Sequence, residues 1–359
     1  MKQQRIGVIG IGKISGIYLD NLTGIFGKRV VLAGLADIIP ERAEQAAKEY
    51  SVKHFKNAEE LIESPDIDIV LNLTQPQHHF DVALKAVNAG KHVYNEKPFC
   101  AKREEALEIS EKATAKKVLL GSAPDTFMGA GMQTCRKLID DGWIGKPLAA
   151  TAFIMSRGME HWHPAPEFFY KVGGGPMFDM GPYYITALVN LLGPVERICG
   201  SAKMGIKQRI ITSEPLNGTI IDVEVPTHIT GVLDFASGVV GTIITSFEVY
   251  SHTLPCIEIY GSEGSLRVPD PNTFGGPVFV QRLMEEKWFE MPLVGAFSEN
   301  SRGLGITDLA EAVSEGRPHR ANGELACHVL DIMHGIHDAS ASGKYYKPVS
   351  SCKRPEPFL

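Results

Sequence analysis

Short apolar runs alternate with amphipathic helical patterns along the N-terminal third of the chain. Five runs predict strands: RIGVIG at 5–10, VVLAGLAD at 30–37, DIDIVLNLT at 66–74, KHVYNEKP at 91–98 and VLLGSA at 118–123. Helical patterns separate them at 15–22, 40–50, 79–90 and 102–117. Strands that are apolar almost throughout and are separated by helices of this length indicate βαβ units and a parallel sheet.

The pattern changes after Ala123. From about Val195 to Met291, apolar and polar residues alternate between turns, which predicts a large antiparallel sheet with hairpins at SEGS and FASGV. Helical patterns flank this region at 131–145, 179–193, 306–315 and 323–342. We therefore expect an α/β domain over 1–122, followed over 123–359 by an α+β domain with a large, mainly antiparallel sheet.

Composition fits two folded domains that handle a small molecule. The 359 residues are 44% hydrophobic and 22% charged, and the net charge is −6. This balance gives no electrostatic basis for binding nucleic acid or an anionic membrane, and no apolar run reaches the roughly 18 residues that span a bilayer. No signal-peptide pattern is visible. The six cysteines are scattered without metal-type spacing, which favours reduced thiols, no metal site and a cytoplasmic protein.

A glycine-rich loop follows the first predicted strand and opens the first predicted helix. In VIGIGKIS, Gly10 allows a tight turn, and Gly12 lets the backbone approach a pyrophosphate at the helix N-terminus. Lys13 and Ile14 belong to the same loop, so we expect all four residues in a dinucleotide site. Asp37 ends the second predicted strand, where a carboxylate accepts the ribose hydroxyls of NAD and repels the 2′-phosphate of NADP. NAD is therefore expected rather than NADP, and a helix N-cap is the alternative role of Asp37.

Two other strand ends are expected at the same edge of the sheet, because the carboxyl ends of parallel strands meet there. One carries Thr74 and Pro76, which we predict to pass beneath the nucleotide, followed by His79 at the start of a helix. His79 either contacts the cofactor or only caps or packs the helix. The other end is NEKP, where Glu96 and Lys97 stand side by side. Lys97 is predicted as an active-site group, and a solvated turn is the alternative.

Taken together, these features resemble the glucose–fructose oxidoreductase / inositol dehydrogenase (Gfo/Idh/MocA) family along essentially the whole chain. The motifs that carry the resemblance are GIGKIS, LNLTQPQHH, AGKHVYNEKPF, LIDDGWIGKP, GGGPMFDMGPYY and SRGLGITDLAEAV. The resemblance implies a Rossmann domain and an α+β domain whose large sheet is open, with NAD- or NADP-dependent chemistry at a carbinol of sugars or polyols. It also implies a homodimer or homotetramer formed through the open sheet face, where Val232, Val240 and Ile244 are apolar.

The resemblance also implies roles for particular residues. Lys97 matches the lysine that contacts the substrate hydroxyl near the nicotinamide, and Glu96 matches the residue that orients it. Asp179 matches the acid of the family's D-x-x-x-H motif, whereas Tyr183 stands where that motif has histidine. The family often carries an arginine soon after its sixth strand, but here PDTFMG contains none and the next arginine is Arg136.

Oxidising a secondary alcohol requires a hydride acceptor and a proton acceptor at one carbon. NAD would supply the first, and the second needs a pKa tuned toward neutrality within reach of the hydroxyl. Tyr183 has an ordinary pKa near ~10, which a neighbouring Lys97 ammonium would lower. The proton acceptor is thus Tyr183 paired with Lys97, Lys97 itself, or His163. Asp179 would steer the lysine or the substrate, and a packed helical face is the alternative for Tyr183.

The segment SRGMEHWHPAPEFFYK is expected to contact the substrate. Arg157, His161 and His163 offer polar groups among aromatic residues, a combination that suits a sugar ring. Packing against the sheet is one alternative, and a metal pair at His161 and His163 is another, although no third metal ligand is visible. Asp125 and Thr126 follow the last predicted strand of the first domain and are expected to face the substrate. The predicted substrate contacts are completed by Lys97, Asp179 and Tyr183.

The leading hypothesis is an NAD(P)-dependent dehydrogenase that transfers hydride between the nicotinamide and a secondary hydroxyl of a sugar, polyol or glycoside. An NAD-dependent glycosidase-type enzyme would use the same hydride step to form a transient ketone that promotes elimination, without net NADH. A non-catalytic dinucleotide-binding regulator is the third hypothesis, and the presence of Lys97 and Asp179 argues against it. The sequence does not name the sugar or polyol.

Overall fold

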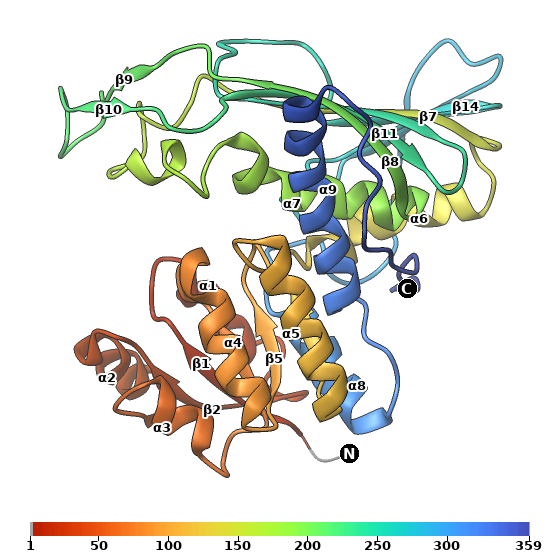
Figure 1. The fold of residues 1–359 in the computed structure, drawn as a ribbon. Coiled ribbons are helices and arrows are strands. Elements are labelled where there is room, and N and C mark those ends of the chain that lie inside the picture. Colours follow the sequence, from red (N-terminus) through yellow and green to blue (C-terminus); the bar gives the residue numbers. More distant parts are fainter. Residues whose placement is uncertain (1–2, 359) are drawn as a thin grey trace. The chain divides into compact units, whose positions relative to one another are not determined.

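The computed structural model describes residues 3–358, which form two compact units (Figure 1). The first unit comprises the residues up to Met128 together with Glu299–Leu330. The second comprises Gly129–Ser298 together with the residues from Asp331 onward, so the division falls within the last helix, α9 (Gly323–Ser342). Among the described helices, none is both long and apolar enough to cross a membrane.

A six-stranded parallel sheet forms the centre of the first unit, as predicted, with the order β3-β2-β1-β4-β5-β6. Its elements are β1 (Arg5–Ile9), α1 (Ser15–Thr23), β2 (Val31–Ala36), α2 (Pro40–Glu49), β3 (Lys53–His54), α3 (Ala58–Glu63), β4 (Ile69–Asn72), α4 (His79–Asn88), β5 (His92–Asn95), α5 (Arg103–Lys116) and β6 (Leu120–Ser122). All four residues of β4 are buried, which explains its continuous apolar run. The short elements β3 and α3 were not predicted.

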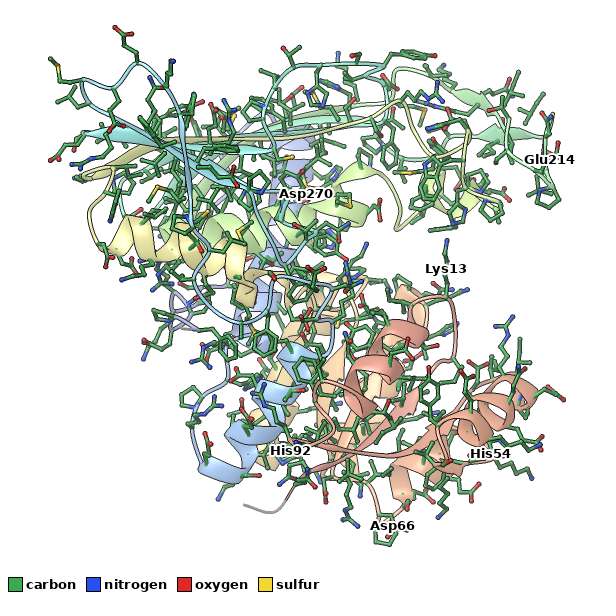
Figure 2. All side chains as sticks on the ribbon, turned by 180° about the vertical axis from the view of Figure 1, so that it is seen from behind. Lys13, His54, Asp66, His92, Glu214 and Asp270 are labelled. Carbon is green, nitrogen blue, oxygen red and sulfur yellow. The ribbon has the colours of Figure 1, made fainter. Side chains whose placement is uncertain are left out.

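The strand order places the beginning of the chain in the middle of this sheet. β1 pairs with β2 on one side and with β4 on the other. In a parallel sheet of this order, ligands bind at the carboxyl ends of the strands where the order reverses. Lys13 follows the carboxyl end of β1, and Figure 2 shows it at the opposite edge of the unit from Asp66 and His92, which lie near the amino ends of β4 and β5.

Residues 299–330 return to the first unit, so this part of the division differs from the single boundary predicted after residue 122. Helix α8 (Leu304–Glu315) packs on β6. Beyond it, Asn322 forms an antiparallel bridge with Gly121, and the Nε2 atom of His319 lies 2.9 Å from the carbonyl oxygen of Leu120. His319 and Leu120 are 199 positions apart, and no local pattern in the sequence reveals contacts over such a distance.

An eight-stranded sheet forms the second unit, in the order β16-β15-β14-β13-β7-β12-β11-β8. Its neighbouring pairs are antiparallel except β7 with β12, which confirms the mainly antiparallel sheet that the alternation predicted. The predicted hairpin turns join β11 to β12 and β13 to β14. The strands are β7 (Pro147–Met155), β8 (Val195–Lys203), β11 (His228–Phe235), β12 (Val240–Ser246), β13 (Ile257–Gly261), β14 (Gly264–Val268), β15 (Val278–Arg282) and β16 (Phe289–Met291).

Helices cover one face of this sheet. α7 (Pro176–Leu192) packs against β7, β11 and β12, and α6 (Ala130–Asp140) packs against α7, β14 and β15. Along β11 the residues alternate between buried and half-buried, which is the period of a strand with one covered face. On the other face, 48% of the surface of Val240 is exposed. The second face therefore retains apolar surface.

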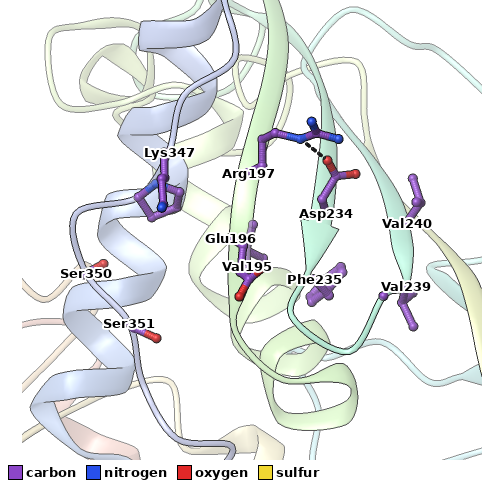
Figure 3. Close-up of a pocket in the computed structure, with 12 residues that line it drawn as sticks. Val195, Glu196, Arg197, Asp234, Phe235, Val239, Val240, Lys347, Ser350 and Ser351 are labelled. Atoms are coloured by element: carbon purple, nitrogen blue, oxygen red, sulfur yellow. Dashed lines mark hydrogen bonds and ion pairs between the residues drawn. The ribbon is translucent and has the colours of Figure 1, made fainter.

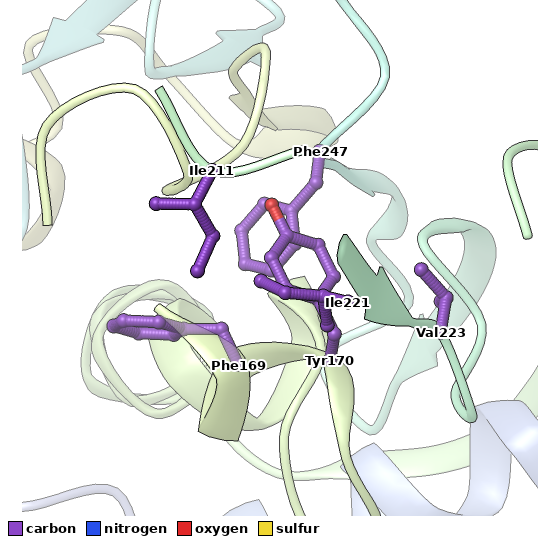
Figure 4. Packing of buried hydrophobic residues seen from close by; sticks show 6 residues of the cluster. All are labelled: Phe169, Tyr170, Ile211, Ile221, Val223 and Phe247. Carbon is purple, nitrogen blue, oxygen red and sulfur yellow. The ribbon is translucent and has the colours of Figure 1, made fainter. Parts of the chain in front are cut away.

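A small hairpin extends the second unit beyond the large sheet. It consists of β9 (Gln208–Ile210) and β10 (Ile220–Asp222), and β10 packs on the short 3-10 helix η3 (Glu167–Tyr170). Figure 4 shows the apolar cluster beneath this hairpin, which we call the hairpin cluster and which consists of Phe169, Tyr170, Ile211, Ile221, Val223 and Phe247. The cluster joins the predicted substrate loop to the hairpin and to the end of β12.

Candidate active site

The loop between β1 and α1 begins at Gly10, whose backbone conformation requires glycine. Gly10 has a φ of +99°, and its N–H donates to the carbonyl of Ala36 at 2.9 Å. A Cβ at Gly10 would lie 2.7 Å from the carbonyl carbon of Leu73, which leaves no room for a side chain. At Gly12, a Cβ would meet no described atom within 4 Å. The backbone of Gly12 is therefore open to a ligand.

The first turn of α1 is suited to an anion. The hydroxyl of Ser15 donates to the carbonyl of Gly12 at 2.8 Å, which holds the loop against the helix. Ile14 at the N-cap makes no side-chain cap, so the N–H groups of the first turn keep their partial positive charge for a phosphate. Lys13 is exposed and projects away from the loop (Figure 2). These residues fit the pyrophosphate of a dinucleotide.

Asp37 connects the glycine loop with the start of α2. One carboxylate oxygen accepts from the N–H of Ile11 at 2.5 Å, and the other accepts from the N–H of Ile39 at 2.7 Å. Each carboxylate oxygen has more than one lone pair, so Asp37 retains acceptor capacity for ribose hydroxyls. Its negative charge at this position disfavours a 2′-phosphate. The bond from the N–H of Ile39 also orders the start of α2. This corresponds to the helix N-cap that the sequence offered as the alternative role of Asp37.

His79, at the start of α4, is fully buried and fastens two loops. Its Nδ1 atom lies 2.7 Å from the carbonyl oxygen of Pro98, and its Nε2 atom lies 2.9 Å from that of Thr74. Burial lowers the pKa of His79, and the two carbonyl contacts oppose that shift. With 0% of its surface exposed, His79 takes the packing role instead of the predicted cofactor contact. Thr74 is half-buried and Pro76 is exposed, and both remain predicted cofactor contacts.

Two buried asparagines at the ends of β4 and β5 were not predicted. The Nδ2 atom of Asn72 donates to Oδ1 of Asn95 at 3.0 Å, and Oδ1 of Asn72 accepts from the hydroxyl of Thr74 at 2.7 Å. The Nδ2 atom of Asn95 donates to the carbonyl of Phe99 at 2.9 Å. These bonds tie the loop after β4 to the turn after β5. A polar residue ending an apolar run, as in IVLN and HVYN, is the signal that could have revealed the pair.

The turn after β5 presents Glu96 and Lys97. Glu96 is buried, and its Oε1 atom accepts from the hydroxyl of Tyr18 at 2.7 Å while its Oε2 atom accepts from the N–H of Lys97 at 2.7 Å. Lys97 is half-buried, and its peptide bond to Pro98 is cis. Because β1, β4 and β5 are neighbouring parallel strands, the glycine loop, the Thr74 loop and the Lys97 turn leave the same edge of the sheet.

Asp125 and Thr126 were expected to face the substrate, but only 1% and 2% of their surfaces are exposed. One carboxylate oxygen of Asp125 accepts from the N–H groups of Gly303 and Gly305, each at 2.9 Å, where α8 begins. Burial raises the pKa of Asp125 to about 6, although these two bonds act in the opposite direction. Asp125 thus caps the returning helix in place of the expected substrate contact, and Thr126 is enclosed in the short turn η2 (Thr126–Met128).

In the second unit, α7 carries Asp179 and Tyr183. Asp179 lies in the first turn, where the helix dipole favours a carboxylate, and its N–H donates to the carbonyl of Gly175 at 3.1 Å. Tyr183 is four positions further, so the two side chains lie on the same side of the helix. Asp179 is half-buried, whereas Tyr183 is buried with 8% of its surface exposed. Their roles in catalysis remain predictions.

A buried ion pair fastens the predicted substrate loop. The Nη1 atom of Arg209, on β9, lies 2.8 Å from Oε1 of Glu160 and donates to the carbonyl of Arg157 at 3.1 Å. The hydroxyl of Tyr170 donates to the other oxygen of Glu160. Burial alone would raise the pKa of Glu160, but hydrogen bonds from Tyr170 and Arg209 outweigh it and lower the pKa. Sequence reasoning missed this pair because the two residues are 49 positions apart.

The three predicted contacts on this loop differ in exposure. Arg157 is exposed, whereas His161 and His163 are half-buried. The ring of His163 makes edge contacts with Trp162 and Phe168, at centroid distances of 5.3 and 5.5 Å. In the part of the chain from residue 3 to 358, no three or more His, Cys, Asp or Glu side chains are grouped so that they could hold a metal ion. The loop thus presents aromatic surface next to polar groups.

A surface pocket of about 720 Å³ lies elsewhere in the second unit (Figure 3). It is formed by the ends of β8 and β11, the turn before β12 and the segment 347–351. Arg197 and Asp234 form an ion pair at 2.5 Å on its wall, and Lys347 lies across from them. None of the predicted site residues lines this pocket, so it does not belong to the candidate site.

The parallel sheet with its glycine loop and the mainly antiparallel second sheet together define a two-domain oxidoreductase fold with a dinucleotide-binding Rossmann domain. Residues 4–123 match the "Oxidoreductase family, NAD-binding Rossmann fold", and residues 132–267 match the "GFO/IDH/MocA C-terminal domain". The chain therefore belongs to the Gfo/Idh/MocA family of oxidoreductases, and its first domain is an NAD-binding Rossmann fold.

Curated relatives of the chain include two inositol dehydrogenases. A myo-inositol 2-dehydrogenase from Thermotoga maritima is 26% identical over 264 residues, which are 73% of this chain and 74% of that protein. A scyllo-inositol 2-dehydrogenase (NAD(+)) from Bacillus subtilis is 28% identical over 268 residues, which are 74% and 73% of the two chains.

Solved structures support the same fold. An NAD-binding oxidoreductase from Klebsiella pneumoniae superposes with a TM-score of 0.84 at 22% identity, covering 97% of this chain and 100% of the other. A levoglucosan dehydrogenase in complex with NADH gives a TM-score of 0.84 at 19% identity, with the same coverage. At these identities, the likeness concerns the fold.

Proposed function

We propose that this protein is an NAD-dependent dehydrogenase that oxidises a secondary hydroxyl of a polyol or sugar, with Lys97 as the central catalytic residue. The observation that carries this proposal is the arrangement at one edge of the first sheet, where the glycine loop, Asp37 and the Lys97 turn follow strands that belong to the same parallel sheet. The inositol specificity of the relatives points to cyclic polyols as the first substrates to examine.

Different residues are proposed to bind different parts of the cofactor. Gly10 and Gly12 form the backbone against which a pyrophosphate fits, with Lys13 and Ile14 in the same loop. Asp37 accepts the ribose hydroxyls, and this favours NAD over NADP. A bound nicotinamide supplies the hydride acceptor. Thr74 and Pro76, and Glu96 and Lys97 at the next strand end, are the further proposed cofactor contacts.

We propose Lys97 as the contact to the substrate hydroxyl next to the nicotinamide, because its turn leaves the same edge of the sheet as the glycine loop. Lys97 is half-buried, and in its neutral form its amine is a base that can accept the proton of a hydroxyl within hydrogen-bond reach. Tyr183 is the second candidate for this step, with Asp179 on the same side of α7 to bind the substrate or steer the proton acceptor. Arg157, His161 and His163 are the proposed substrate contacts of the loop that Arg209 holds.

A panel of inositols, sugars, polyols and glycosides with NAD tests the proposal, with NADH formation read from its absorbance. We expect NADH to form with at least one cyclic polyol or sugar, and we expect Lys97→Ala to abolish this while NAD still binds. Glycoside cleavage without net NADH would support the elimination reaction instead. A chain that binds NAD and acts on no member of the panel would support a regulator and contradict the proposal.

We further propose that the chain forms a homodimer or homotetramer through the open face of the large sheet. Val232 and Ile244, on β11 and β12, are half-buried, and Val240 is exposed on the same pair of strands. Apolar surface of this kind on a strand face favours association. Light scattering should give a mass of two or four times 39.2 kDa, and Val232→Lys with Val240→Lys should reduce it.

A cytoplasmic location is also part of the proposal. All six cysteines are free thiols, and four of them are buried. Burial raises the pKa values of Cys100 and Cys135, so these thiols stay protonated and unreactive. Free thiols of this kind suit a reducing compartment. Fractionation of the source cells tests this location, and finding the protein outside the cytoplasmic fraction would contradict it.

A further inference from the structure

Tyr18 forms a link between the cofactor helix and the Lys97 turn that nothing in the sequence had suggested. It lies on α1 with 0% of its surface exposed, and its hydroxyl donates to Oε1 of Glu96 at 2.7 Å. The other oxygen of Glu96 accepts from the N–H of Lys97 at 2.7 Å, and the N–H of Glu96 donates to the carbonyl of Asn72 at 2.9 Å. The carboxylate of Glu96 therefore bridges α1 and the peptide of Lys97.

The surroundings keep Tyr18 as a hydrogen-bond donor. Burial raises its pKa well above the ordinary value, and the negative charges of Glu96 and Asp125 raise it further. The phenol consequently acts as the donor in its bond to Glu96. A buried carboxylate is destabilised unless donors satisfy it. The hydroxyl of Tyr18 and the N–H of Lys97 supply one donor to each oxygen of Glu96, which fixes the orientation of the carboxylate.

The groups around this link come from β5, the loop after β6 and the start of α8. Tyr94 on β5 and Asp125 after β6 both contribute to the electrostatic surroundings of Tyr18. Asp125 is in turn bonded to the start of α8, and the positive charge of Arg302 acts on it. On the α1 side, Glu96 is thus bound by the neutral hydroxyl of Tyr18. The other carboxylate nearby, that of Asp125, is hydrogen-bonded to the start of α8.

The position of Tyr18 on α1 connects this link with the cofactor. Ser15 begins α1 and binds the carbonyl of Gly12, and Tyr18 follows three positions later, within one turn of the N-terminus that faces the pyrophosphate. A short rigid helical turn therefore lies between the dinucleotide loop and Glu96. The same turn that receives the cofactor also determines where the carboxylate beside Lys97 points.

We propose that Tyr18 is a positioning residue for the reaction: through Glu96, it sets the orientation and the proton affinity of Lys97 and couples them to the helix that binds the dinucleotide. This inference rests on the proposed function of Lys97. It predicts that loss of the Tyr18 hydroxyl lowers kcat and changes the reactivity of the Lys97 amine, while the glycine loop still binds NAD. A purely structural role predicts a change in thermal stability alone.

Tyr18→Phe removes the hydroxyl and keeps the ring. Tyr50→Phe is the matched control, because the hydroxyl of Tyr50 donates to Oδ1 of Asp20 at 2.7 Å and so forms a tyrosine–carboxylate bond with the same helix, away from Glu96. In Tyr18→Phe we expect kcat to fall about tenfold or more, the loss for one hydrogen bond to a charged acceptor, with the dissociation constant of NAD unchanged. Tyr50→Phe should retain the wild-type kcat.

The reactivity of Lys97 gives a readout that needs no substrate. Trace labelling of the folded, full-length protein with an amine-reactive ester, followed by peptide mass spectrometry across a pH series, yields the labelling rate and the pKa of the Lys97 amine. We expect the rate to change by about tenfold in Tyr18→Phe, which corresponds to one pKa unit, and to stay unchanged in Tyr50→Phe. If the wild-type protein oxidises no substrate, the proposed function fails but the labelling still decides the role of Tyr18.

A Tyr18→Phe protein that matches the wild type in kcat and in Lys97 labelling, with only a lower Tm, would overturn the inference. Equal changes in Tyr18→Phe and Tyr50→Phe would also overturn it, because they would indicate a general effect of α1. Should Tyr18→Phe not fold, Glu96→Gln answers the same question, since it weakens the same bond from the acceptor side. Unchanged Lys97 labelling in Glu96→Gln would then contradict the inference.

Discussion

Arg209→Met should destabilise the second unit far more than the replacement of a typical, exposed arginine would. The guanidinium of Arg209 is buried, with 5% of its side chain exposed. It contacts Glu160 at 2.8 Å and Glu248 at 3.8 Å, and it donates to the carbonyl of Phe247 at 2.9 Å. It also lies over the ring of Tyr170, 5.4 Å from its centroid. Methionine retains much of the apolar volume but none of these polar contacts.

The magnitude follows from what the substitution leaves behind. The side chains of Glu160 and Glu248 are only 14% and 18% exposed, so both carboxylates would remain in a poorly solvated region without their cation. Breaking a buried pair from one side costs about 3–5 kcal/mol. For a unit of roughly 200 residues, each kcal/mol lowers Tm by about 2–4 °C, so we expect a fall of about 6–20 °C.

Arg197→Met provides the matched control. Arg197 also pairs with a carboxylate, Asp234 at 2.5 Å, but 59% of its side chain is exposed. Water screens such a pair, so its loss should lower the stability far less than the loss of Arg209. Scanning calorimetry of the wild type and both variants measures the difference. If Arg209→Met lowered Tm no more than Arg197→Met, the reasoning from burial would be refuted.

The difference between the wild type and Arg209→Met should depend on pH. In the wild type, the pKa of Glu160 is lowered because the bonds from Tyr170 and Arg209 outweigh burial. A lowered pKa means that ionised Glu160 contributes stability above its ordinary pKa of 4.5 and that this contribution is lost as the pH falls through the lowered value. The gap in Tm should therefore be largest near neutral pH and narrow in acid.

Three further predictions concern the first unit. Lys97→Ala should lower kcat by about 10²-fold or more while calorimetry still detects NAD binding, and near-normal turnover would remove Lys97 from its role. Asp37→Ser should move the ratio of kcat/KM for NAD over NADP toward NADP, and an unchanged ratio would show that Asp37 does not select the cofactor. Because burial raises the pKa of Asp125 to about 6 from 3.8, its stabilising contribution is complete below pH 3.8 and lost as the pH rises through 6. Urea unfolding across this pH range should show that the free energy of unfolding of the wild type falls by about 3 kcal/mol relative to that of Asp125→Asn. Parallel pH curves for the two proteins would contradict the raised pKa of Asp125.

Local patterns were sufficient for the main elements of the first unit. Its strands are buried on both sides and therefore read as short apolar runs, and its glycine loop has few alternatives when it stands between a strand and a helix. The alternation along β11 and β12 likewise predicted a sheet with one open face. β3 and α3 escaped prediction because two and six residues are too short to show a period.

The groups that hold the site in place were harder to foresee. Tyr18 looks like an ordinary core residue in GIYLDNL, and only the fold reveals that its hydroxyl meets a carboxylate 78 positions away. Arg209 stands in a polar stretch, where charge usually means exposure. Asp125 was misjudged for the opposite reason: a carboxylate next to a strand end suggested a ligand, but its partners are backbone N–H groups from a segment nearly 180 positions later. Pairings across such separations carry no local signal.

The return of residues 299–330 to the first unit has a consequence for synthesis and dissection of the chain. While the ribosome has made only the first 298 residues, β6 lacks its bridge at Gly121, and Asp125 lacks the N–H groups of Gly303 and Gly305. Until then the edge of the parallel sheet is bare, and such edges invite pairing with other chains. The nucleotide-binding unit, although encoded first, therefore cannot complete its fold until the chain has been made as far as Leu330, and an N-terminal fragment that ends at residue 122 should aggregate.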